Sequence, residues 1–224
     1  GCPAFHVERR AGKCRGCGSR ISFQYILVEL LTAAIFVGVA GVAVSIFGGG
    51  YPLASLRFFV WNAGLASLLV LIAGYDLRHK IIPDELVYAF IGAAALTGFI
   101  VHASVGFSQM VWLLHGLYSG GILFALFWAL WHFSKGRLMG LGDAKLVFGL
   151  GLWLGLKVSL LTLLIAFVAG ATVGLLLIGL KSWRRLPPAF RALSLKSELP
   201  FAPFLVFGAI MSFIIAIYAT PLAS

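Results

Sequence analysis

Two aspartates stand in short polar stretches, and each stretch adjoins a long apolar run. The first is Asp76, in the stretch 75–84, and the second is Asp143, in the stretch 140–146. A carboxylate at a membrane boundary is costly unless it is paired, hydrated or used, so acids in such places are functional candidates. The chain has only seven acidic residues, and these two have proline or glycine nearby. We interpret them as a catalytic pair.

Two carboxyl groups in one site can perform acid–base catalysis. They do not both ionise readily, so the pair offers one general base and one general acid. The base activates a water molecule toward a peptide carbonyl, and the acid protonates the oxyanion or the leaving amine. This proteolysis needs no acyl-enzyme and no cofactor. Gly140 and Gly142 would let the backbone come close to Asp143 and to an extended substrate strand. The alternative is that both aspartates are solvated residues at helix ends.

The elements that must position these aspartates are membrane helices. Of the 224 residues, 61% are hydrophobic and 11% are charged, whereas a soluble chain has about 25% charged residues. Mean hydropathy is +1.04, and apolar runs recur at about the length a helix needs to cross a bilayer. The sequence predicts an all-α, polytopic transmembrane bundle. The net charge of +10 comes from basic loops between these runs, so it indicates membrane topology rather than nucleic-acid binding.

The apolar runs predict about seven spans. They lie near residues 21–47, 56–75, 84–102, 110–133, 143–156, 158–180 and from 200 onward. The N-terminal segment and the loops after the second, fourth and sixth spans hold nearly all Lys and Arg, which favours a cytosolic N-terminus. The same alternation places Asp76 and Asp143 on one cytosolic face, so charge counting supports the paired-aspartate hypothesis independently.

Two further acids have local interpretations. Glu29 lies about two turns inside the first apolar run, where a lone acid should face the bundle interior, a partner or a water-filled cleft. It is either a hydrogen-bonded structural acid or a residue near the active site. Asp84 follows Pro83 at the predicted start of the third span, where a negative charge suits the positive end of the helix dipole.

The two aspartate stretches together resemble the type IV prepilin peptidases, which are bacterial inner-membrane aspartyl proteases of the Gly-x-Gly-Asp type. The resemblance rests on Asp76-x6-Pro83-Asp84 and on Lys135-Gly136-x3-Gly140-Leu141-Gly142-Asp143-Ala144-Lys145-Leu146. Three other stretches agree in order along the chain: 14–22, 28–32 and 199–204.

The resemblance implies that Asp76 and Asp143 are the catalytic aspartates, and we take Lys145 as a further candidate for support of the site. It implies a multi-pass protein of the bacterial inner membrane. Its partners would be the lipid bilayer and prepilins or type II secretion pseudopilins, cut after a Gly that ends a short basic leader. Many members then methylate the new N-terminal amine with S-adenosylmethionine, an activity for which this sequence offers no separate motif.

The N-terminal segment departs from the family pattern. We expect residues 1–20 to be a cytosolic basic segment and 21–224 a transmembrane peptidase domain. Members usually have another span before this segment, and many bind zinc there through two Cys-x-x-Cys pairs. Here Cys14 and Cys17 form one pair, but Cys2 stands alone because Phe5 occupies the partner position. A structural zinc ion takes four ligands, so Cys2, Cys14 and Cys17 would need His6 to complete a degenerate site.

Two other classes of function compete with peptidase. A small transporter or channel could use Glu29, Asp76 and Asp143 as a proton or cation path, but carriers place such acids near the midplane, often in related halves. No repeat relates the halves of this chain. An inactive paralogue that serves as a structural subunit is the other alternative.

Overall fold

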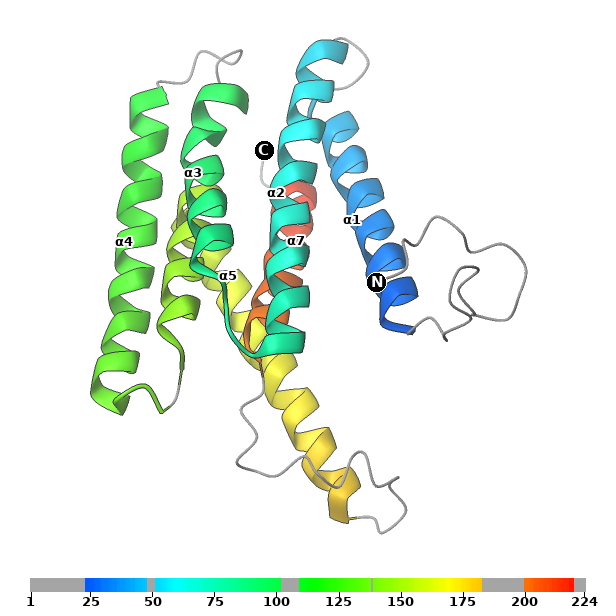
Figure 1. The fold of residues 1–224 in the computed structure, drawn as a ribbon. Helices are drawn as coiled ribbons and strands as arrows, with labels where there is room; N and C mark the ends of the chain where they lie inside the picture. The colour runs from blue at the N-terminus through cyan, green and yellow to red at the C-terminus, as the bar shows by residue number, and fades with distance from the viewer. Residues whose placement is uncertain (1–22, 48–50, 102–108, 138, 183–199, 220–224) are drawn as a thin grey trace, which may run out of the picture.

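The fold is a bundle of helices, seen here in a computed structural model that describes residues 23–47, 51–101, 109–137, 139–182 and 200–219. These residues form six helices and no strand, so the all-helical prediction is confirmed for them. The helices are α1 (Phe23–Phe47), α2 (Pro52–His79), α3 (Asp84–Val101), α4 (Gln109–Ser134), α5 (Leu141–Ser182) and α7 (Ala202–Ala219) (Figure 1).

Four stretches of helix are long and apolar enough to cross a membrane. They are Val28–Phe47, Pro52–His79, Gln109–Ser134 and Leu141–Leu176, and Ala202–Ala216 is a shorter apolar helix. The helices run alternately up and down, so α2 and α4 end where α3, α5 and α7 begin (Figure 1). We call this the site end of the bundle. The predicted number of seven spans and the cytosolic N-terminus stay predictions.

The helix α5 is broken at Gly155, which has φ 72° and ψ 172°. A positive φ is easy for glycine and strained for other residues. The second arm then runs back toward the site end (Figure 1), and Ser159 beyond the break donates a hydrogen bond to the carbonyl of Leu150 before it (3.1 Å). Because the break falls at Gly155, the first arm, residues 141–154, is only about 20 Å long. The predicted division between residues 156 and 158 falls close to this break.

The second helix is longer than the sequence pattern indicated. The apolar run ends at Tyr75, but α2 continues to His79, so Asp76 lies in the last helical turn rather than after it. A single polar residue does not interrupt helical hydrogen bonding. The helix ends where Lys80 adopts a left-handed conformation (φ 53°) and its N–H bonds to the carbonyl of Asp76 (2.8 Å).

Small residues let α4 and α5 pack backbone against backbone. A Cβ added at Gly151 would lie 2.5 Å from the Cα of Gly120, and one added at Gly116 would lie 3.0 Å from the carbonyl oxygen of Leu152. Close approach of this kind is the usual basis of helix association in lipid, where the hydrophobic effect contributes little. This close packing fixes the first arm of α5, which carries Asp143, against α4.

Polar side chains also tie the helices together inside the bundle. The indole N–H of Trp153 on α5 donates to the side-chain oxygen of Asn62 on α2 (2.9 Å), and both side chains are buried. The indole N–H of Trp61 donates to the hydroxyl of Thr97 on α3 (3.1 Å). Interhelical hydrogen bonds in lipid contribute about 0.6–2 kcal/mol each. The first of these bonds joins the two helices that carry the aspartates.

Candidate active site

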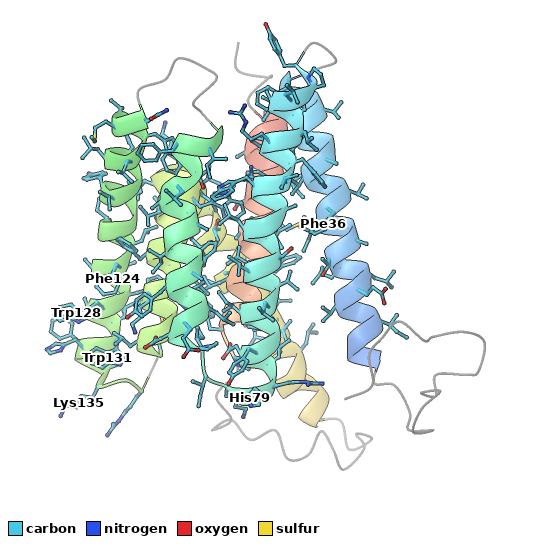
Figure 2. All side chains as sticks on the ribbon, turned by 45° about the horizontal axis from the view of Figure 1, so that its top comes forward. Phe36, His79, Phe124, Trp128, Trp131 and Lys135 are labelled. Carbon is cyan, nitrogen blue, oxygen red and sulfur yellow. The ribbon has the colours of Figure 1, made fainter. Side chains whose placement is uncertain are left out.

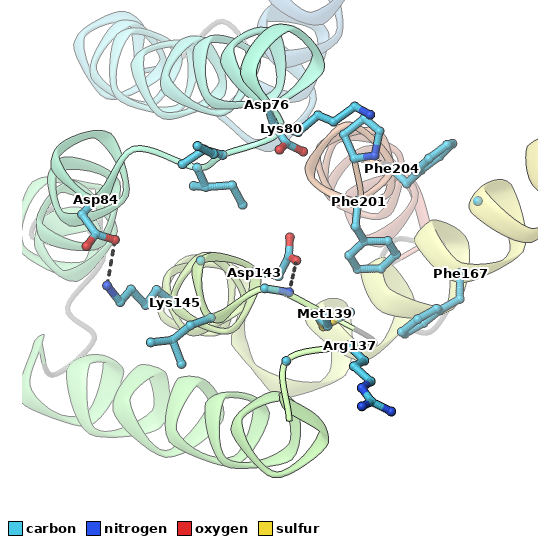
Figure 3. A pocket seen from close by; sticks show the side chains of 18 of the residues that line it. Asp76, Lys80, Asp84, Arg137, Met139, Asp143, Lys145, Phe167, Phe201 and Phe204 are labelled. Carbon is cyan, nitrogen blue, oxygen red and sulfur yellow. Dashed lines mark hydrogen bonds and ion pairs between the residues drawn. The ribbon is translucent and has the colours of Figure 1, made fainter. Parts of the chain in front are cut away.

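A cavity of about 700 Å³ opens at the site end of the bundle. Its lining comes from the end of α2, the connection 80–83, the start of α3, residues 136–137 and 139–140, both arms of α5 and the start of α7. Asp76 and Asp143 both belong to this lining. Their carboxyl groups point toward one another across the cavity (Figure 3). The structure therefore brings together the two aspartates that the sequence predicted as a pair.

Asp76 lies between the end of one helix and the start of another. It lies in the last turn of α2 and is 5% exposed. The carbonyl end of a helix disfavours a negative charge, whereas the amide end favours it. The backbone N–H of Ala202, the first residue of α7, donates to Oδ2 of Asp76 (3.3 Å). The start of α7 thus offsets the unfavourable position at the end of α2.

Asp143 has a different setting. It lies in the first turn of α5, where the helix dipole favours a carboxylate, and it is 8% exposed. The backbone N–H of Gly140 donates to its Oδ2 (3.3 Å). In the part of the chain that the structure describes, the second oxygen of each aspartate accepts no hydrogen bond. Each carboxyl group is therefore fixed through one oxygen and can use the other toward a ligand.

Comparison with known proteins agrees with this geometry. Residues 63–175, half of the chain, match the Type IV leader peptidase family, and residues 6–42 match the Bacterial Peptidase A24 N-terminal domain. The chain belongs to the type IV leader peptidase family. The matched range contains both aspartates and the helices α3, α4 and most of α5 that lie between and around them.

Several curated relatives of this chain are named prepilin leader peptidase/N-methyltransferase. The chain is 32% identical to one from Aeromonas hydrophila, over 87% of the chain and 59% of that protein. It is 32% identical to one from Burkholderia pseudomallei (88% and 56% covered) and 28% identical to one from Bacillus subtilis (91% and 71% covered). The chain thus spans under two thirds of the first two relatives. No solved structure matches it significantly.

The glycines beside Asp143 contribute in two ways. Gly140 supplies the N–H that holds the aspartate. Gly142 lets the start of α5 approach the connection 80–83, because a Cβ at this position would lie 3.0 Å from the Cβ of Ile82. The sequence predicted that both glycines would let the backbone come close to Asp143 and to a substrate strand, and the approach to a substrate stays a prediction. In the structure, Gly142 approaches Ile82 in the stretch that follows Asp76.

The predicted supporting residues Lys145 and Glu29 fall in different places. Lys145 lines the cavity, and its Nζ lies 2.7 Å from Oδ1 of Asp84 (Figure 3). Glu29 lies on α1, is exposed, and is not among the residues that line the cavity. A role for Glu29 in this site stays a prediction. The predicted zinc ligands Cys2, Cys14, Cys17 and His6 lie outside the described residues.

Sequence reasoning missed two parts of the candidate site. One is the N–H of Ala202, and the other is an aromatic wall formed by Phe167, Phe201 and Phe204. The rings of Phe167 and Phe201 lie 5.1 Å apart between centroids. The prolines on either side of Phe201 and Ala202 indicated a helix start, but nothing in the stretch indicated that this start would face Asp76. The wall gives the cavity an apolar side opposite its charged side.

Proposed function

We propose that this chain is a membrane aspartyl endopeptidase that cleaves the basic leader of type IV prepilins or type II secretion pseudopilins. The observation that carries the proposal is the facing pair of buried aspartates in one cavity (Figure 3). Membership of the type IV leader peptidase family and the names of the relatives support the reaction and the substrate class.

In the proposed reaction the pair holds one proton between its two carboxyl groups. The ionised aspartate takes a proton from water as the water oxygen attacks the scissile carbonyl carbon, and the protonated aspartate gives its proton to the carbonyl oxygen. Collapse of the tetrahedral intermediate then breaks the C–N bond: the aspartate that took the proton from water gives it to the leaving amine, and the other aspartate takes up a hydroxyl proton of the intermediate. The N–H groups of Ala202 and Gly140 hold one oxygen of each aspartate throughout.

The proposed orientation places the cavity at the cytosolic face of the bacterial inner membrane. His79 and Lys135 lie at the site end, and Trp128 and Trp131 lie just inside it on α4 (Figure 2). Arg78, Lys80 and Arg137 belong to the same end. Basic residues favour the cytosolic side, and tryptophans favour the membrane interface. If the two arms of α5 are counted as separate spans, the helices make seven spans, and this distribution supports a cytosolic N-terminus, which would leave the cavity open to a cytosolic leader.

The relatives' names also include N-methyltransferase, so we propose methylation of the new N-terminus, with S-adenosylmethionine as donor, as a second activity. We assign no residue to it. The thiols of Cys2, Cys14 and Cys17 are the groups from which a zinc site would be built. The transporter alternative is not favoured, because Glu29 does not line the cavity that holds Asp76 and Asp143.

The test is cleavage of a prepilin leader in membranes that contain the chain. Asp76→Asn and Asp143→Asn should each abolish cleavage, and the double variant should be little worse, because residues that act as a unit are strongly non-additive. Glu85→Gln, which removes an exposed charge outside the cavity, should cleave normally. Immunoblots establish equal protein amounts. Normal cleavage by either asparagine variant would falsify the proposed mechanism.

A further inference from the structure

An ion pair crosses one side of the cavity, opposite the aromatic wall (Figure 3). The Nζ of Lys145 lies 2.7 Å from Oδ1 of Asp84 and 5.2 Å from the ring centroid of Tyr88, one helical turn along α3. An ammonium group within about 6 Å of an aromatic ring is attracted by the ring. The side chain of Lys145 is 20% exposed and that of Asp84 is 58% exposed. Lys145 therefore has its partners on α3 and not on the catalytic carboxyl groups.

The two partners stand next to the two catalytic stretches. Lys145 follows Asp143 by two residues in the first turn of α5. Asp84 is the first residue of α3, and only the connection 80–83 separates it from the helix that carries Asp76. Both Lys145 and Asp84 line the cavity. A bond between them therefore joins the backbone segments of the two aspartates, whereas the hydrogen bonds of Ala202 and Gly140 each reach only one aspartate.

The same region is held by a steric contact. Ile82, in the middle of the connection 80–83, lies so close to Gly142 that a Cβ there would be 3.0 Å from the Cβ of Ile82. The ion pair at Asp84, directly after the connection, opposes separation of this segment from α5, and the close approach of Ile82 to Gly142 leaves little room for a shorter distance. Both contacts lie between the end of α2 and the start of α5.

We propose that the Asp84–Lys145 ion pair is a positioning clamp that sets the separation of the two catalytic aspartates. This inference rests on the proposed peptidase function. Lys145 and Asp84 are positioning residues, and neither takes part in proton transfer. The role of Asp84 thus goes beyond that of a helix N-terminal charge.

The exposure of the ion pair indicates whether its loss should change the stability of the fold or the rate of catalysis. An ion pair with one partner more than half exposed contributes little to the stability of a fold. Its loss should therefore leave the amount of folded protein nearly unchanged. It should instead lower kcat by roughly fivefold, the equivalent of about 1 kcal/mol. KM should change less, because the aromatic wall, which we expect to contact a substrate, lies on the other side of the cavity.

The test compares kcat and KM for leader cleavage by the full chain in membranes. Lys145→Met and Asp84→Asn should each lower kcat roughly fivefold, and the double variant should be no worse than either, as expected for one shared interaction. Lys145→Arg, which keeps the charge, should recover most of kcat. Glu85→Gln removes a neighbouring charge from the same turn of α3 and should leave kcat unchanged.

A second measurement reports the geometry without activity. Ile82→Cys, in a background without native thiols, should react with a thiol reagent roughly fivefold faster when combined with Lys145→Met, and no faster with Glu85→Gln. The clamp is refuted if the losses in kcat from Lys145→Met and Asp84→Asn multiply in the double variant. It is also refuted if Lys145→Met leaves the labelling rate of Ile82→Cys unchanged. If the wild type cleaves and Asp76→Asn does not, such a result refutes the clamp alone. A wild type that does not cleave refutes the function itself.

Discussion

Replacing Gly142 with alanine tests how closely the two motif stretches must approach. The new Cβ would lie 3.0 Å from the Cβ of Ile82, whereas carbon atoms in contact prefer about 3.5–4.0 Å. A gap of about 0.5–1 Å must therefore open. Because the Cβ of Ile82 is fixed to its own backbone, no side-chain rotation relieves the contact, and the connection 80–83 itself has to shift. Overpacking of this kind costs about 1–3 kcal/mol.

The shift would act on catalysis because this connection begins four residues after Asp76. A displacement of about 1 Å in a catalytic group can cost about a hundredfold in rate. We therefore expect Gly142→Ala to lower kcat/KM for leader cleavage by roughly ten- to a hundredfold. The matched control is Gly74→Ala. Gly74 lies two residues before Asp76 on α2, and a Cβ there would meet no atom within 4 Å.

Second-site variants sharpen the test. Adding Ile82→Gly to Gly142→Ala removes the opposing Cβ and should recover activity. Adding Ile82→Ala retains that Cβ and should recover none. The assay is the rate of leader cleavage in membranes with matched protein amounts. A wild-type rate for Gly142→Ala, or an equal loss in Gly74→Ala, would refute this account of the Gly-x-Gly-Asp motif.

Three further predictions concern the bundle. Gly151→Ala should lower the free energy of unfolding in detergent by about 1–3 kcal/mol, because its Cβ would lie 2.5 Å from the Cα of Gly120, whereas Gly121→Ala, with no atom within 4 Å, should be neutral. Asn62→Ala leaves the indole N–H of Trp153 without its acceptor and should cost about 1 kcal/mol in the same assay; an unchanged unfolding curve would contradict the tie between α2 and α5. In intact cells that express a variant without the three native cysteines, Tyr51→Cys should react with an impermeant thiol reagent and Lys135→Cys should not. The reverse pattern would contradict the proposed topology.

Several features of the molecule follow from its sequence because they depend on residues close together in the chain. The apolar runs predicted the helices, since the length and polarity of a segment decide whether it can span lipid. The left-handed turn at Gly155 falls beside the predicted division of α5 because glycine permits it. Asp76 and Asp143 could be selected as candidates because acids are costly beside apolar runs.

Other features depend on contacts between distant residues. The sequence did not indicate that the N–H of Ala202 would reach Asp76, or that Lys145 would pair with Asp84. A hydrogen bond or ion pair of this kind depends on where separate helices end. The end of α2 at His79 lies a full turn beyond Tyr75, where the apolar run ends. Glu29 shows the same limit, because its position inside an apolar run could not tell which face of α1 it would occupy. Packing alone decided that Asp76 and Asp143 face one cavity while Glu29 stays outside it, since only the assembled bundle determines which helix faces meet.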